Sequence, residues 1–204
     1  MRVYVLDTET TGLSGCPGDL VLEVAAVEAD TSSCTVRPVY SQVVGYDVSS
    51  WDDGLRGSWI FRNSDLTVEE VGEGRPMELV AGELRALLDG RPCTSYNTGF
   101  DFDRFLLREP WSLRPVIAQD VMEAAHRVVP GDRDLGGGLT SWPKLSKAYA
   151  MLCPDDPGGI GDSQRHRALE DAVMAACILL KLSDVGAYTG KPDEDKIEPS
   201  RSAD

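Results

Sequence analysis

The order of strand-like and helix-like segments constrains the fold of this 204-residue chain more than any other feature. Three segments that favour strands come first, at Tyr4–Asp7, from Leu20 and from Thr35. Segments that favour helices and strands then alternate, and helices follow. Because strands joined by a helix usually pair in parallel, this order predicts an α/β fold. We expect a mixed sheet with a three-stranded antiparallel start, later parallel strands, and helices on both faces.

Apolar spacing and helix-terminating residues predict where the helices lie. The strongest prediction covers 76–90, where Pro76 suits the first helical position and Gly90 ends an apolar stripe. Thr67 and Glu70 fit a capping box for a short helix within the polar, irregular segment 45–74. Further helices are predicted at 100–109, 122–129, 143–152 and 166–182, and further strands at 93–97 and 116–121.

Length and composition predict one globular domain over residues 1–185. Of the 204 residues, 42% are hydrophobic and 26% charged, which suits a substantial core. Residues 186–204 are polar and charged, and predict a disordered tail. No apolar run reaches about 18 residues. The first run ends at Asp7, too early for a secretory signal, so we expect a cytoplasmic protein. Five scattered cysteines without a CxxC pair argue against a zinc site or a disulfide framework.

The charge distribution limits which partners the chain can bind. The net charge is −14, and residues 1–90 carry 6 basic and 16 acidic side chains, against 11 and 13 over residues 91–185. A broad basic surface for duplex DNA is therefore not expected. A small site that neutralises phosphate with bound metal is compatible with this distribution. The second half also offers arginines that could meet an anion, namely Arg104, Arg108, Arg127, Arg165 and Arg167.

The first apolar strand runs directly into two acids, Asp7 and Glu9. Residues i and i+2 of a strand point to the same face, so the two carboxylates are expected to lie together. Their repulsion, and the raised pKa that follows, can be relieved by a hard divalent cation with oxygen ligands. Taken alone, such a pair is more often two solvated acids at a strand end.

Two later segments carry candidate partners for these acids. Asp101 follows the strand 93–97 and opens a helix, although an acid there is also favoured by the helix dipole alone, as we infer for Asp103. His166 and Asp171 lie five residues apart, about 140° around a helix. Both can face one site if His166 lies in the loop or first turn. His126, the other histidine, has no matching acidic pattern and is interpreted as a surface or packing residue.

Three segments together resemble a known family. DTETTGL (7–13), NTGFDFDRFL (97–106) and HRALEDA (166–172) resemble, in order, the three motifs of the DEDDh 3′–5′ exonucleases. That family includes the proofreading subunit of bacterial replicative DNA polymerase, RNase T and oligoribonuclease. The resemblance spans residues 3–182 and implies an RNase H-like fold. The HxxxxD spacing differs from the YxxxD spacing of the related tyrosine type.

The resemblance also implies a role for each matched residue. It implies two Mg²⁺ or Mn²⁺ ions about 3.5–4 Å apart. Asp7 would bridge them, Glu9 and Asp171 would help hold the first, and Asp101 would hold the second. His166 would act as general base. The substrate would meet a further set, namely Thr10, Thr11, Gly12, Asn97 and Phe100.

The resulting expectation is a metal-dependent 3′–5′ exonuclease that releases nucleoside 5′-monophosphates from single-stranded ends, with DNA favoured slightly over RNA. Two positions depart from the family pattern, Tyr96 and the stretch 62–67, and the second concerns substrate choice more than catalysis. The alternatives are an RNA-trimming enzyme of the same family and a non-catalytic interaction module that retains the fold. A role in proofreading or repair, a DNA polymerase partner and a homodimer are each compatible with the resemblance.

Overall fold

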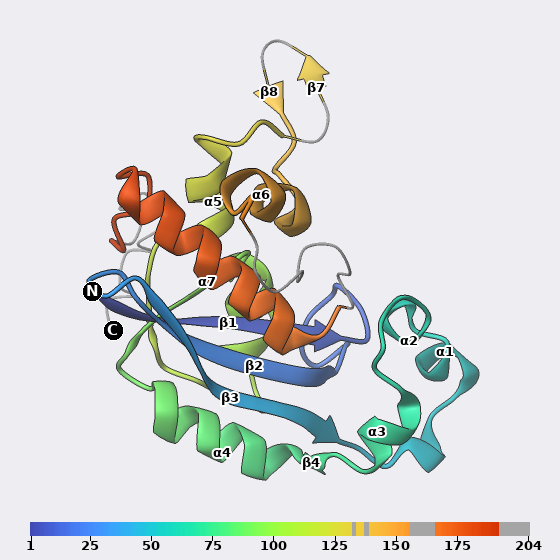
Figure 1. The fold of residues 1–204 in the computed structure, drawn as a ribbon. Helices are drawn as coiled ribbons and strands as arrows, with labels where there is room; N and C mark the ends of the chain where they lie inside the picture. The colour runs from blue at the N-terminus through green and yellow to red at the C-terminus, as the bar shows by residue number, and fades with distance from the viewer. Residues whose placement is uncertain (132–133, 137–138, 156–165, 192–204) are drawn as a thin grey trace, which may run out of the picture.

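A central mixed sheet organises the protein (Figure 1). The computed structural model describes residues 1–131, 134–136, 139–155 and 166–191. The strand order is β4-β3-β2-β1-β5-β6. β1, β2 and β3 are antiparallel neighbours, whereas β5 and β6 extend the sheet in parallel from β1, as predicted. The strands are β1 (Arg2–Thr10), β2 (Val21–Asp30), β3 (Thr35–Gly45), β4 (Arg75–Pro76), β5 (Pro92–Ser95) and β6 (Val116–Ile117).

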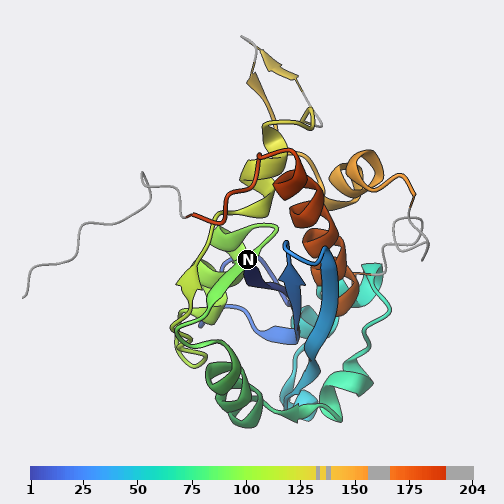
Figure 2. The same ribbon diagram turned by 60° about the vertical axis from the view of Figure 1, so that its left-hand side comes forward.

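Helices cover both faces of the sheet, again as predicted (Figures 1 and 2). The alternation of β1 explains the two layers: Val3 and Val5 join one core, and Tyr4 and Leu6 join the other. The first core is closed by α5 (Val121–His126), α6 (Leu145–Leu152) and α7 (Ala168–Asp184). The second is closed by α4 (Met77–Leu88) and by η2 (Gly99–Leu106), which is wound as a π-helix.

The segment that looked irregular in the sequence folds into short helices beside the end of the sheet. They are η1 (Val48–Ser50), α1 (Asp53–Arg56), α2 (Trp59–Asn63) and α3 (Val68–Gly72). The predicted capping box is present: the Glu70 amide donates to Thr67 Oγ1 over 3.1 Å, and the Thr67 amide donates to Glu70 Oε2 over 2.9 Å. A small core of Leu22, Ile60, Leu66 and Val71 ties this segment to β2.

Two features at the periphery extend what the sequence predicted. A two-stranded hairpin, β7 (Asp134–Gly136) and β8 (Leu139–Thr140), lies in a region for which the sequence predicted no strand or helix. At the other end, Tyr188 is only 2% exposed, and the Thr189 amide donates to Gln119 Oε1 over 2.8 Å. The packed chain thus includes residues that we had assigned to the tail, while 192–204 lie outside the described residues. Among the described helices, none combines the length and apolar character needed to span a bilayer.

Candidate active site

Both acids of the first strand reach the α7 side of the sheet. β1 continues to Thr10, so Asp7 and Glu9 alternate onto the same face as Val3 and Val5. Asp7 is half-buried and Glu9 is 8% exposed. Glu9 lies opposite Glu23 of β2 in the strand register, which places a further buried acid beside the pair.

Asp101 approaches the same strand from η2. Its Oδ1 accepts hydrogen bonds from the Thr8 amide at 3.1 Å and from Thr8 Oγ1 at 2.7 Å. Asp101 is 3% exposed, and burial raises the pKa of this carboxyl to about 6 although the Thr8 hydrogen bonds oppose the rise. Thr8 lies between Asp7 and Glu9 in β1, and its two hydrogen bonds fix the orientation of Asp101.

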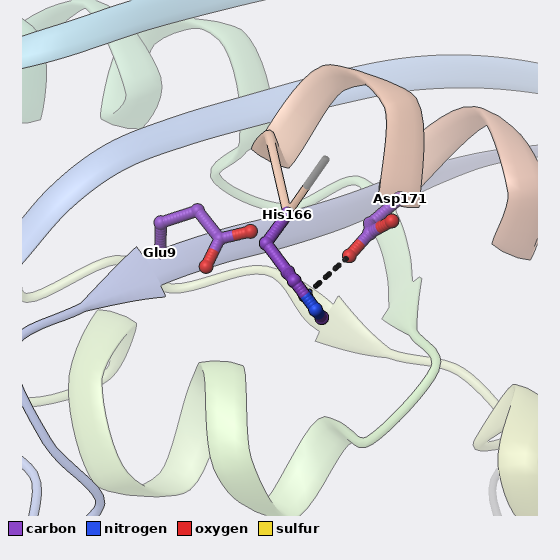
Figure 3. A group of neighbouring side chains, drawn as sticks. All are labelled: Glu9, His166 and Asp171. Carbon is purple, nitrogen blue, oxygen red and sulfur yellow. Dashed lines mark ion pairs between the residues drawn. The ribbon is translucent and has the colours of Figure 1, made fainter. Parts of the chain in front are cut away.

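His166 and Asp171 complete the cluster from the start of α7 (Figure 3). His166 lies in the loop before the helix, with φ +48°, and Asp171 lies in the first turn. His166 Nδ1 is 3.9 Å from Asp171 Oδ2. One donor atom each from Glu9, His166 and Asp171 all lie within 4.8 Å of one another. The loop-plus-helix placement that the spacing required is thus what the chain adopts.

The electrostatics of the site show that the carboxylates repel one another. Burial, followed by the charges of Asp101, Asp171 and Glu9, raises the pKa of Asp7 well above its ordinary value. Burial and then Asp171 do the same to Glu9. Acidic oxygen donors held together at such a cost suit a hard divalent cation, which would relieve the repulsion. The donor set therefore fits the metal that the sequence implied.

A cavity of about 460 Å³ adjoins this cluster. Its lining includes Thr10, Thr11, Gly12 and Phe100, four of the residues predicted to meet the substrate. The remaining lining residues are Thr8, Glu9, Leu13, Trp59 and Ile60. Asn97, the fifth predicted substrate residue, does not line this cavity, and its Oδ1 accepts the Phe100 amide at 3.2 Å at the start of η2.

The loop after β1 leaves no room for a side chain at Gly12. A Cβ at this position would clash with the Asp19 carboxylate. Asp19 itself is held by the Ser14 amide at 2.7 Å and by Thr11 Oγ1 at 3.3 Å. A side chain at position 12 would therefore push apart the loop that forms one wall of the cavity.

Sequence reasoning missed several residues of the site. Trp59 comes from the segment 45–74, and its ring meets the His166 ring edge-on with centroids 5.1 Å apart. The sequence signal for Trp59 is weak: it is an aromatic residue in a segment that we interpreted as polar and irregular. Glu23 gave no signal because it stands in an ordinary strand.

The arginines offered by the sequence are partly engaged elsewhere. Arg167 pairs with Glu23 and Glu70 at 2.9 and 3.3 Å, so it is not a free anion site. Arg104 donates to the Leu13 carbonyl at 2.6 Å and lies 5.9 Å from the Phe100 ring centroid, beside the cavity. Arg165 lies outside the described residues.

Comparison with solved structures defines the class of fold. E. coli exonuclease I in complex with a dA16 oligonucleotide matches 90% of this chain and 41% of its own, with a TM-score of 0.57 and 15% identity. Cell-death related nuclease 4 (CRN-4) matches 91% of this chain and 64% of its own, with a TM-score of 0.56 and 14% identity. The fold is the RNase H-like α/β fold that the sequence predicted.

Comparison of sequences adds one particular relative. The 3′-5′ exonuclease DinG of Bacillus subtilis (strain 168) is 29% identical over 184 residues. The match covers 89% of this chain but 17% of the relative, so the chain spans only a small part of that protein's length. No known family profile matches the chain.

Proposed function

We propose that this chain is a metal-dependent 3′–5′ exonuclease that acts on single-stranded nucleic-acid ends. One observation carries the proposal: Asp7, Glu9, Asp101, Asp171 and His166 converge from three distant segments at the edge of one cavity. Structural packing alone gives no reason to gather four carboxylates there, because each raises the pKa of its neighbours. The similarity to the exonuclease DinG supports the same activity.

The acids are suited to hold two divalent cations, Mg²⁺ or Mn²⁺. Asp7 would bridge the pair, Glu9 and Asp171 would complete one site, and Asp101 would serve the other. Such ions, when bound, supply an activated water and stabilise the leaving 3′ oxygen. Thr8 would keep Asp101 aimed at the site through its two hydrogen bonds.

His166 would accept the proton of the attacking water. It is partly exposed and within reach of both Glu9 and Asp171, so it borders solvent and the acids together. Asp171 Oδ2 lies 3.9 Å from His166 Nδ1, so this carboxylate can orient the imidazole ring toward the attacking water.

The adjoining cavity suits the base and sugar of a 3′-terminal nucleotide. Trp59, Leu13 and Phe100 offer apolar surface on which an unpaired base can stack. A base that is paired within a duplex is not available for this contact. Thr10, Thr11 and Gly12 line the same space. We favour DNA slightly over RNA, and exonuclease I, which has been solved with a dA16 oligonucleotide, is compatible with that preference.

A matched degradation assay tests the proposal. The purified chain is incubated with 5′-labelled single-stranded DNA or RNA, with Mg²⁺, Mn²⁺ or EDTA, beside Asp7→Ala. We expect a metal-dependent ladder that shortens from the 3′ end, and loss of it in the variant. Full activity in a clean Asp7→Ala preparation would disprove the site assignment. Faster loss of RNA would favour the RNA-trimming alternative.

Metal-linked stability separates the enzyme from a non-catalytic module. An intact two-metal site should raise the melting temperature when Mg²⁺ is added, because the ions bind only the folded acids. A chain that shows neither stabilisation nor degradation would be the interaction module. A polymerase partner and a homodimer are separate predictions, tested by pull-down with a replicative polymerase and by size-exclusion chromatography with light scattering.

A further inference from the structure

An ion pair between the buried Glu23 and the half-buried Arg167 lies beside the proposed active site. The Glu23 carboxylate of β2 accepts Arg167 Nε at 3.0 Å and Nη2 at 2.9 Å, in the two-pronged geometry that only arginine provides. Glu23 is 4% exposed. Arg167 is the residue immediately after His166, so the pair fastens the backbone of the histidine loop to the sheet.

The same carboxylate also caps α7. Arg167 occupies the N-cap position, and its side chain makes no capping hydrogen bond. Glu23 Oε2 takes over that role and accepts the Ala168 amide at 3.1 Å. The first turn of α7 carries Asp171, so one buried side chain on β2 fixes both the histidine loop and the helix start.

A second contact joins this anchor to the segment that carries Trp59. Arg167 Nη1 donates to Glu70 Oε1 of α3 at 3.3 Å. From α2 in the same segment, Trp59 packs edge-on against His166. Two contacts therefore constrain His166. Glu23 holds the adjacent residue Arg167, and Trp59 packs against the His166 ring.

We propose that Glu23 and Arg167 are positioning residues that hold His166 over the acids of the active site. The inference rests on the proposed exonuclease function and extends it to two residues that do not touch the reacting atoms. His166 has φ +48°, in the left-handed region that residues with a side chain occupy infrequently. The bidentate ion pair of the next residue, Arg167, helps to hold the backbone in this conformation.

Arg167 gives Glu23 a different role from that of Glu9, which we propose as a metal ligand. Glu23 faces Glu9 across the strand pair, yet its two oxygens are committed to Arg167 and to the Ala168 amide. The guanidinium also lowers the pKa of Glu9, against the rise that burial and the other acids cause. Glu23 thus supports the site from outside the metal-binding set.

The test removes the pair in two ways and uses the full chain throughout. Arg167→Met leaves the buried Glu23 carboxylate without its cationic partner and is expected to lower the melting temperature as well as the activity. The double variant Glu23→Gln/Arg167→Met removes both charges and keeps an amide oxygen that can accept the Ala168 amide. Arg167→Lys keeps the charge but loses the two-pronged geometry. Arg37→Met, which breaks the Arg37–Glu28 pair between β3 and β2, is the control.

Two readouts separate positioning from folding. For the double variant we expect a melting temperature near that of the wild type, kcat still about 10–100-fold low, and KM within about twofold. The imidazole NMR resonances of His166 should shift in every Arg167 variant and not in Arg37→Met. They can be assigned because the chain has two histidines and His126→Gln identifies the other.

Each result decides the proposal. Recovery of kcat together with stability in the double variant would show that the pair only supports folding. Unchanged His166 resonances in Arg167→Lys would equally overturn the positioning role. If the wild-type chain degrades no substrate, the proposed function fails, and the resonances still decide whether the pair positions His166.

Discussion

Two threonines hold two buried acids in the same way. The amide and Oγ1 of Thr8 both donate to Asp101, at 3.1 and 2.7 Å. The amide and Oγ1 of Thr98 both donate to Asp120, at 2.7 and 2.9 Å. Asp120 also accepts the Glu123 amide at the start of α5 at 3.0 Å. The effect of removing the threonine hydroxyl can therefore be compared at Asp101, a proposed metal ligand, and at Asp120, which caps α5.

Thr8→Val should impair metal use, whereas Thr98→Val should not. Each change removes one hydrogen bond to a buried carboxylate, which lowers stability by about 1.5–3 kcal/mol. Only Thr8→Val also loosens a proposed ligand, so only it should raise the Mg²⁺ concentration needed for half-maximal activity. Magnesium titrations of both variants, beside thermal melts, check this. An equal rise in the Mg²⁺ requirement for both would place the effect in general stability.

Asp101 predicts an unusual dependence of stability on pH in the metal-free chain. Its pKa is raised from 3.8 to about 6, so the folded state holds this proton more tightly than the unfolded state. The stabilisation by the bound proton is therefore complete below about pH 4 and is lost as pH rises through about 6. Asp101→Asn should be more stable than wild type at pH 7.5 by on the order of 2–3 kcal/mol.

Urea unfolding in EDTA at several pH values measures this difference. The advantage of Asp101→Asn should shrink toward pH 4, because the wild-type carboxyl is then protonated and neutral like the amide. If the difference in free energy of unfolding between Asp101→Asn and wild type stays constant from pH 4 to 7.5, the titration of Asp101 does not cause it.

At the scale of elements, the site depends on a short helix that the sequence left undefined. α2 brings Trp59 to His166 and to the cavity, although its ring is 54% exposed. An aromatic ring exposed to this extent contributes little to the core, and its orientation toward the site points to contact with substrate. α2 is itself fixed by Ile60, which is 2% exposed in the small core against β2.

Trp59→Ala should therefore weaken substrate binding more than folding. We expect KM for a single-stranded oligonucleotide to rise about tenfold, since stacking of one base contributes about 1–3 kcal/mol. Trp142→Ala is a matched control, because Trp142 is 50% exposed and packs on His126 rather than His166. Steady-state kinetics and melting temperatures of both variants test the difference. If Trp59→Ala and Trp142→Ala changed KM equally, Trp59 would not be part of the substrate-binding surface.

At the scale of the whole molecule, the sequence predicted most of what periodicity controls. The antiparallel start of the sheet, its later parallel strands, the long helices and the capping box at Thr67 were predicted from local patterns, and the structure confirms them. Asp7, Glu9, Asp101 and Asp171 were predicted as metal ligands because three motifs stand in order. Glu23 and Trp59 were missed because their roles depend on contacts with residues more than a hundred positions away, which no local pattern encodes.

The distribution of charge over the molecule makes a last prediction. Few described cations adjoin the cavity: Arg167 is paired, and Arg104 is the exposed guanidinium beside Phe100 and Leu13. Affinity for single strands should then depend weakly on salt, with a log–log slope no steeper than about −2, since each neutralised phosphate contributes about −0.7.

Fluorescence anisotropy with a labelled single strand at fixed Ca²⁺ and varied NaCl measures this slope without turnover by Mg²⁺. Arg104→Met should flatten the slope by about 0.7, the effect of one phosphate contact, and Arg37→Met, on the outer strands, should leave it unchanged. A slope near −5 would reveal an extensive basic track for the strand. With a net charge of −14, the chain must instead draw its affinity from stacking and from the metal-bound end of the strand.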